Sequence, residues 1–267
     1  MHAMHHRSAL LASIGLLVLA LATAGCSTTP SSADSTGSIA TASVPRTEAE
    51  WRREMEVSGQ RYRAAPQDGE AAIRYAQALR AVGQRAQAAA VLEQSAIQNP
   101  QNQAVLGAYG RALADNGNYS QAIDVLNRAH TPDQPDWRIL SVQGAAFDQM
   151  GKHQEAQRYY ASALRIVPDE TSVLSNLGLS YALSKNLPKA EVTPRRAAAH
   201  PGAAPKVRQN LALVVGLQGR FAEAETIARG DLSPEEATAN VGILRRMLAQ
   251  QNDPKKLNRG LAPSTGS

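Results

Sequence analysis

The stretch from Trp137 to Glu170 decides the fold, and it reads WRILSVQGAAFDQMGKHQEAQRYYASALRIVPDE. Five kinds of residue in it recur at steps of 34 residues. They are a small residue (Gly144), a large apolar residue (Phe147), a turn residue (Gly151), an alanine (Ala156) and a closing proline (Pro168). The other small residues are Ala76, Gly110, Gly178 and Ala212, and the other alanines are Ala88, Ala122, Ala190 and Ala224. The other turn residues are Gly83, Gly117 and Gly219, with Lys185 as the exception, and the other closing prolines are Pro66, Pro100 and, one residue early, Pro201.

A period of about 34 residues with these landmarks is the signature of tetratricopeptide repeats (TPRs). The two small residues let antiparallel helices approach closely. The glycine can take the left-handed conformation that ends the first helix, and the proline ends the second. The sequence therefore predicts an all-α fold, a superhelical TPR solenoid with a capping helix at each end.

The composition limits the classes of partner. The chain of 267 residues has a formal net charge of +5 at pH 7, and aromatic residues make up only 4% of it. Acidic and basic residues are interspersed, with no basic stripe that contains aromatic residues, so we expect no nucleic-acid partner. Because Cys26 is the single cysteine, a disulfide within the chain is excluded.

Residues 1–25 predict a bacterial secretory signal, with a basic head, an apolar run and small residues at its end. Two processing routes are open. In the first, the residues before Cys26 resemble a lipobox, which would make Cys26 the lipid-anchored residue, although Thr23 stands where that family usually has leucine. Ser27 then resembles a signal for sorting to the outer membrane. In the second, cleavage after Ala24 would follow the A-x-A rule and give a soluble periplasmic protein.

The remaining boundaries follow from composition and period. Residues 26–46 are rich in serine and threonine and predict a disordered tether, and residues 252–267 predict a disordered tail. Residues 47–251 predict the TPR solenoid, with capping helices over 47–65 and 234–251. Five hairpins are expected between them, over 69–102, 103–136, 137–170, 171–204 and 205–232.

The fourth hairpin departs from the pattern. Pro194 stands where other units have Leu92, Leu126 or Tyr160. Proline inside a helix removes a hydrogen bond, at a cost of about 3 kcal/mol. We therefore expect a kinked or shortened helix around 189–194.

No arrangement of residues predicts catalysis. Beyond the signal, the histidines His130, His153 and His200 fall at different repeat positions, and none has a second ligand at metal spacing. Nucleophile and phosphate-binding motifs are also absent from the sequence. We expect a protein that is not an enzyme and has no metal or cofactor.

A TPR array offers instead a groove lined by the first helix of each hairpin. Asn176 and Asn210 lie 34 residues apart in this lining, and an amide can both donate to and accept from the backbone of a bound peptide. The alternative is that each amide bonds a neighbouring helix end. Further candidates for partner binding in the groove are Arg80, Arg111, Arg138, Ser175 and Gln209, and the cationic ones would select an acidic ligand.

The signal with its terminal cysteine, the tether and the repeats match a bacterial family. The runs Leu187–Glu191 and Arg208–Phe221 belong to the same match, as do Ala239–Val241 and Leu244–Leu248. Together they resemble the TadD family, the TPR lipoproteins of the tight-adherence (Tad/Flp) pilus assembly system. The resemblance covers roughly residues 47–251, and Pro194 departs from the apolar residue that is usual in the family.

The resemblance implies a non-enzymatic assembly factor on the periplasmic face of the outer membrane. Its partner would be the pilus secretin or another assembly component, with a pilotin-like role for the secretin. Two alternatives remain, a soluble periplasmic TPR adaptor for cell-envelope enzymes and an accessory subunit of a separate enzyme.

Overall fold

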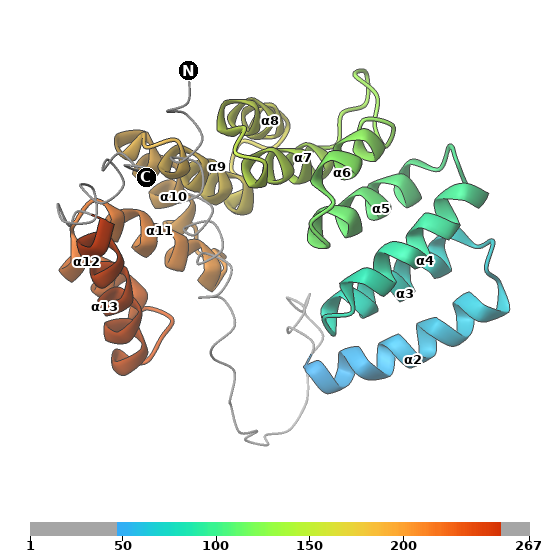
Figure 1. The fold of residues 1–267 in the computed structure, drawn as a ribbon, viewed down its shortest axis with the longest axis horizontal. Helices are drawn as coiled ribbons and strands as arrows, with labels where there is room; N and C mark the ends of the chain where they lie inside the picture. The colour runs from blue at the N-terminus through green and yellow to red at the C-terminus, as the bar shows by residue number, and fades with distance from the viewer. Residues whose placement is uncertain (1–46, 252–267) are drawn as a thin grey trace, which may run out of the picture. The chain divides into compact units, whose positions relative to one another are not determined.

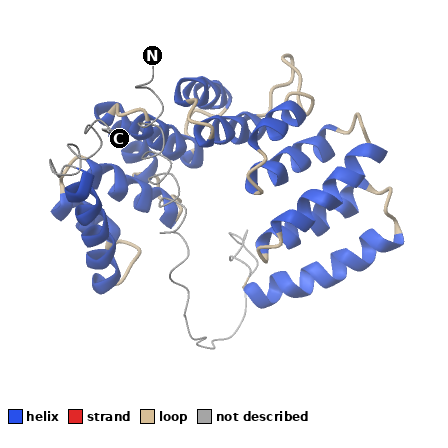
Figure 2. Ribbon diagram, in the orientation of Figure 1, coloured by secondary structure: helices blue, strands red, loops and turns tan. Residues whose placement is uncertain are grey.

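The computed structural model describes residues 47–251, which form α-helices and no β-strand (Figures 1 and 2). The helices are α2 (Glu48–Ala64), α3 (Gly69–Ala81), α4 (Arg85–Gln98), α5 (Gln103–Asp115), α6 (Tyr119–Leu126), α7 (Trp137–Gln149), α8 (His153–Ile166), α9 (Thr171–Leu183), α10 (Leu187–Ala198), α11 (Pro205–Leu217), α12 (Phe221–Ala228) and α13 (Pro234–Gln251). The predicted all-α fold is confirmed. The signal segment, Cys26, the tether and the C-terminal tail lie outside the described residues.

The chain divides into two compact units. The division falls between Gly151 and Lys152. We call their described parts, 47–151 and 152–251, the N-terminal and C-terminal units. Each is described by itself below.

The turns within the hairpins share one backbone conformation. Gly83, Gly117, Gly151 and Gly219 have φ angles of 83°, 87°, 74° and 82°, in the left-handed region that favours glycine. Lys185 takes the same conformation with φ 63° in the turn between α9 and α10, although its side chain makes that conformation strained. The repeat therefore imposes the turn even where the sequence lacks glycine.

Close contacts between the two helices of a hairpin form what we call the seam. A Cβ added to Gly110 on α5 would lie 2.4 Å from Cγ of Leu126 on α6. A Cβ added to Gly178 on α9 would lie 2.4 Å from Cδ of Pro194 on α10. These two pairs occupy the same repeat positions, so the small residue of the first helix receives the large residue of the second.

Of the kink or shortening expected around 189–194, the shortening is wrong, and the kink stays a prediction. Helix α10 continues through Pro194 to Ala198, and the proline ring is fully buried against Gly178. Proline still removes one helix hydrogen bond. The ring nevertheless fills the seam position that Leu126 fills in another hairpin, and this packing compensates for the lost bond.

Each unit has its own apolar core. In the N-terminal unit one cluster joins the hairpins, with Leu79, Leu92, Leu106 and Leu126 almost fully buried in it. In the C-terminal unit separate clusters form around Leu174 and around Val215. Burial of leucine-sized side chains contributes about 1.5–3 kcal/mol each, so these clusters are the main source of stability.

The first and last described helices both begin with a capping box. Thr47 accepts a hydrogen bond from the Glu50 backbone N–H, and the Glu50 carboxylate accepts one from the Thr47 backbone N–H. Ser233 and Glu236 make the same reciprocal pair at the start of α13. Both helices therefore start at defined residues.

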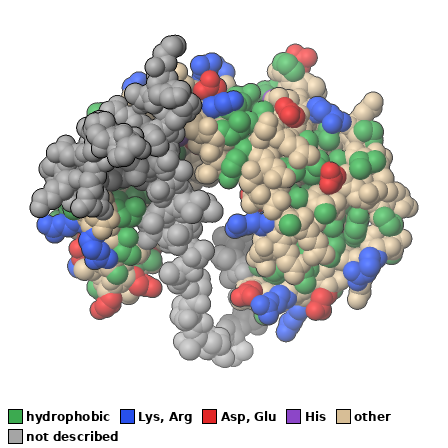
Figure 3. All heavy atoms as spheres, viewed as in Figure 1, with side chains coloured by type: hydrophobic (Ala, Val, Ile, Leu, Met, Phe, Trp, Pro, Cys, Tyr) green, Lys and Arg blue, Asp and Glu red, His purple; other side chains and the backbone are tan. Residues whose placement is uncertain are grey.

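No helix within residues 47–251 combines the length and the apolar character that crossing a membrane requires. On the face shown in Figure 3, acidic and basic side chains of the described residues are interspersed with apolar ones.

Candidate protein-binding surfaces

Five charged residues gather on the first helices of the N-terminal unit, and we call them the arginine cluster. Its members are Arg80 on α3, Arg111 and Asp115 on α5, Asp136 before α7 and Arg138 on α7. Helices α3 and α5 pack together, as do α5 and α7. The three arginines predicted as groove residues in this unit are therefore close enough to interact electrostatically.

Both aspartates of the arginine cluster already have partners. Asp115 forms an ion pair with Arg80, in which the two side chains remain 36% and 27% exposed. Asp136 caps α7 by accepting a hydrogen bond of 2.7 Å from the Arg138 backbone N–H. The Arg138 guanidinium lies over the Trp137 ring, 4.6 Å from its centroid, which is a favourable cation–π geometry.

Arg111 differs from these residues. Its side chain is half-buried, and within residues 47–251 it forms no hydrogen bond or ion pair. Burial lowers the pKa of the Arg111 guanidinium and the charge of Arg80 lowers it further, while Asp115 and Asp136 oppose this shift. A partly desolvated cation without a paired anion is a position at which an external anion would gain a strong interaction.

The predicted polar residues of the C-terminal unit are placed differently. Asn210 on α11 donates a hydrogen bond of 2.9 Å to the Ser175 hydroxyl on α9, and these two residues are only 6% and 2% exposed. Asn176 and Gln209 are half-buried on the same two helices. Asn210 thus has an internal partner, although it is a side chain within α9 and not the helix end that the sequence allowed as an alternative. Partner binding by all four residues stays a prediction.

Sequence reasoning missed Asp115 and Asp136 as neighbours of the predicted arginines. A signal existed, because Arg80 and Asp115 are 35 residues apart, as are Ser175 and Asn210. Side chains of adjacent first helices therefore meet when they are 35 residues apart, which is one repeat of 34 residues plus one residue.

A charged network in the C-terminal unit joins α10 to α12. Glu191 accepts hydrogen bonds from Arg195, Gln218 and Arg220 at 2.9, 3.0 and 2.7 Å, and Glu223 accepts from Arg195 and Arg220 at 2.7 and 2.8 Å. Burial raises the pKa of Glu191, but the hydrogen bonds outweigh it and hold that pKa below its ordinary value. All the charges are paired internally, so this network is structural.

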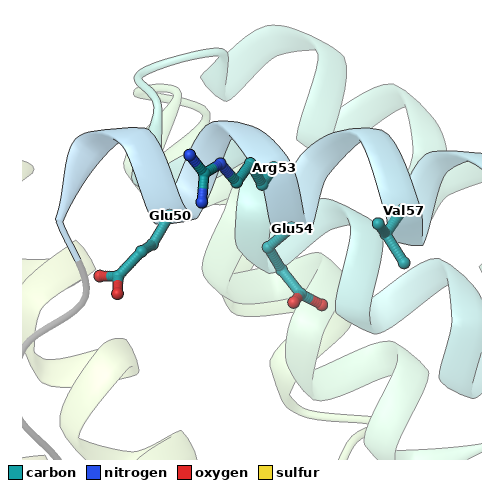
Figure 4. Close-up of a pocket in the computed structure, with 4 residues that line it drawn as sticks. All are labelled: Glu50, Arg53, Glu54 and Val57. Carbon is teal, nitrogen blue, oxygen red and sulfur yellow. The ribbon is translucent and has the colours of Figure 1, made fainter.

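A cavity of about 270 Å³ lies beside α2 and is lined by four residues of that helix, Glu50, Arg53, Glu54 and Val57 (Figure 4). Glu50 belongs to the capping box of that helix. Among the described residues no group of histidine, cysteine, aspartate or glutamate is arranged to hold a metal ion.

Comparison with known proteins agrees with this architecture. Two family models described as tetratricopeptide repeat match, one over residues 79–144 and one over residues 142–207. No curated protein sequence matches the chain.

Solved structures share the fold at low sequence identity. PilW, a type IV pilus biogenesis factor, aligns with a TM-score of 0.63 and 14% identity, over 72% of this chain and 91% of PilW. A tetratricopeptide repeat protein of Parabacteroides merdae aligns with a TM-score of 0.62 and 12% identity, over 76% and 78% of the two chains. A TPR protein of Thermus thermophilus aligns with a TM-score of 0.58 and 22% identity, over 68% of this chain and 99% of that protein. With the repeat period, the helix hairpins and the two family models in agreement, residues 79–207 contain tetratricopeptide repeats and the described residues have an all-α TPR fold.

Proposed function

We propose that this protein is a non-enzymatic interaction scaffold that assists assembly of the tight-adherence (Tad/Flp) pilus machine, as a member of the TadD family. TPRs indicate a protein-interaction scaffold. The observation that carries the site is the arginine cluster, whose unpaired Arg111 lies on a first-helix face suited to a protein segment. The family resemblance of the sequence supports the pilus role, and PilW shows that a pilus biogenesis factor can have this fold.

The proposed partner is the pilus secretin or another assembly component, with the scaffold in a pilotin-like role. Deletion of the gene should abolish surface pili and adherence while pilin synthesis continues. Electron microscopy and a pilin immunoblot on the same cells measure both, and a complementing plasmid is the control. Normal piliation in the deletion strain would disprove the proposal.

Affinity capture from detergent-solubilised envelopes tests the partner directly. Wild-type protein should retain the secretin or another pilus component. The variants Asn176→Ala and Asn210→Ala are compared separately, since Asn210 is a buried residue and Asn176 is half-buried. Loss of capture with Asn176→Ala alone, at unchanged thermal stability, would assign that amide to partner binding.

The proposed location is the periplasmic face of the outer membrane, through a lipid on Cys26. The Cys26→Ala variant should move from the membrane fraction to the soluble periplasmic fraction, and palmitate labelling should disappear. The second candidate, a soluble periplasmic adaptor for cell-envelope enzymes, is favoured by the A-x-A pattern at Ala24. It predicts wild-type protein in the soluble fraction and capture of cell-wall enzymes in place of pilus components.

A further inference from the structure

Helix α2 has the place of a second helix in a hairpin. It packs on α3 as α4 packs on α5. A Cβ added to Gly59 on α2 would lie 3.0 Å from the Tyr75 ring on α3. The residues 34 positions later are Glu93 and Tyr109, and Glu93 interacts with the Tyr109 hydroxyl. The same two repeat positions therefore meet in both places, and α2 follows the register of the second helices.

A second helix normally turns one face toward the first helix of its own hairpin. In the second hairpin, the Ala122 carbonyl oxygen and the Ala129 Cβ would lie 3.3 and 4.0 Å from Cβ atoms added to two glycines of α5. Two repeats earlier these positions belong to α2. No first helix precedes α2 in the described part of the chain. We call this face of α2 the open seam, and its residues, spaced three and four apart, are Glu50, Glu54, Val57 and Arg61.

The open seam has an apolar residue at its middle. The cavity beside α2 lies along this face, since Glu50, Glu54 and Val57 all line it (Figure 4). Val57 is 48% exposed, whereas Val125, its counterpart two repeats later, is only 8% exposed. Because α2 comprises residues 48–64, Val57 lies close to the midpoint of the helix. One exposed valine is ordinary on a protein surface, but the charges on either side of it form a pattern.

The charge of α2 reverses about this valine. Over residues 48–56, four glutamates and two arginines give a net charge of −2, and over residues 57–64 two arginines give +2. On the open seam itself, Glu50 and Glu54 lie in the acidic half and Arg61 in the basic half. Such a helix is complementary to a second copy of itself that runs in the opposite direction, because each acidic half then lies beside a basic half.

We propose that the open seam binds the open seam of a second copy of this chain, so that two α2 helices pair antiparallel in a symmetric dimer. The two-fold axis passes near Val57, where the valines of both copies meet. Glu54 of each copy then lies beside Arg61 of the other copy, in two equivalent ion pairs. Each α2 takes the place of the first helix that the other lacks. One pair of helices of 17 residues is a small interface, so the dimer is reversible.

Disulfide trapping tests this pairing. The full chain with Cys26→Ser has no native cysteine, and Val57→Cys in that background places a thiol beside the two-fold axis. The control is Arg52→Cys, since Arg52 is exposed on another face of α2. Both purified proteins are oxidised with copper phenanthroline and separated by electrophoresis without reductant. We expect a dimer band for Val57→Cys and about fivefold less for Arg52→Cys, since cysteines with distant Cα atoms cannot be bridged.

Charge reversal tests the direction of the pairing. In the Val57→Cys protein, Glu54→Arg alone or Arg61→Glu alone should lower the trapped fraction by about tenfold, because each sets like charges beside each other. A mixture of the two reversal proteins should restore trapping, since each copy then meets opposite charges at both ion pairs. Circular dichroism of each variant checks that the helices are intact.

Four results would overturn the proposal. They are equal trapping of Val57→Cys and Arg52→Cys, no dimer band, unchanged trapping in both reversal variants, and a mixture that is trapped no better than its components. Since the purified sample contains no other protein, an open seam that is occupied by a different protein or by the N-terminal segment of the same chain would give no dimer band.

Discussion

At the scale of single residues, the seam between α9 and α10 depends on the absence of a side chain at Gly178. An added Cβ would lie 2.4 Å from Pro194 Cδ and 2.8 Å from the Ala190 carbonyl oxygen, and the latter is backbone that cannot rotate away. We expect Gly178→Ala to lower the free energy of unfolding by about 1–3 kcal/mol, as for overpacked cores. Urea denaturation followed by circular dichroism measures the change.

The matched control is Gly242→Ala on α13, in the same unit. Its Cβ would meet only the end of the Arg246 side chain at 3.8 Å, which is ordinary contact. Alanine favours helix over glycine by about 1 kcal/mol, so this variant should be as stable as wild type or more stable. A similar loss in both variants would mean that the seam is not the cause.

The buried pair Ser175–Asn210 gives a second prediction at this scale. Ser175→Ala leaves the Asn210 amide without its acceptor at a buried position. We expect a loss of about 1–3 kcal/mol, the cost of one unsatisfied buried polar group. A double-mutant cycle with Asn210→Ala should show coupling between the two residues. Additive losses would show that the bond contributes nothing to stability.

Asn210 also shows where residue-level prediction fails. The 34-residue register correctly places Asn176 and Asn210 on equivalent positions of first helices, yet only Asn210 is buried against Ser175. Helical periodicity defines which face a residue occupies. It does not tell which polar side chain on that face finds an internal partner, because that depends on the residue 35 positions away.

At the scale of elements, the turn between α9 and α10 carries strain that the other hairpin turns avoid. Lys185 has φ 63°, a conformation that costs a side-chain-bearing residue about 1–2 kcal/mol. Lys185→Gly should therefore raise the free energy of unfolding by about 0.5–1 kcal/mol, net of the greater chain entropy of glycine. Thermal or urea denaturation would detect this gain.

The reciprocal variant is Gly219→Lys, at φ 82° in the turn between α11 and α12. It should lower stability by a similar amount. If Lys185→Gly destabilises the protein, the strain assigned to this turn is absent.

The elements were largely predictable because turns and helix ends have strong local signals. The glycine register predicted the left-handed turns, and the closing prolines Pro100 and Pro168 predicted the ends of α4 and α8. Pro194 was misjudged since proline acts locally against a helix, whereas its burial depends on Gly178 on another helix. The low helix propensity of a proline therefore does not end a helix where its ring packs against the facing helix of the hairpin.

At the scale of the whole molecule, the Glu191 network makes stability depend on pH. The pKa of Glu191 in the folded protein lies below its ordinary value of 4.5, so its contribution is present above about pH 4.5. That contribution disappears as the pH falls through the folded pKa. We expect Glu191→Gln to cost about 1–2 kcal/mol at neutral pH, and wild type and variant should converge at acidic pH.

Urea midpoints measured from about pH 7 down to about pH 3 test this. The control is Glu235→Gln, an exposed residue at the start of α13. A constant difference between wild type and Glu191→Gln across that range would contradict the assigned role of the carboxylate.

The fold of residues 47–251 was predictable because the repeat supplies the same signal several times, so that exceptions such as Lys185 do not obscure it. The binding surface was less predictable. Arg80, Arg111 and Arg138 were correctly identified as residues of first helices, but their unequal pairing follows from Asp115 and Asp136. Which cation remains free is a property of neighbouring repeats together.

The seam also constrains how a gene for such a chain can recombine. Gly178 faces Pro194 across one hairpin, while Ala76 holds the position of Gly178 in another. A crossover between hairpins would transfer each small residue together with its matching large one. A crossover inside a turn that joined α3 to α10 would set the Ala76 methyl group against the Pro194 ring. Gain or loss of repeats during evolution is therefore expected to occur in whole periods, with breakpoints between hairpins.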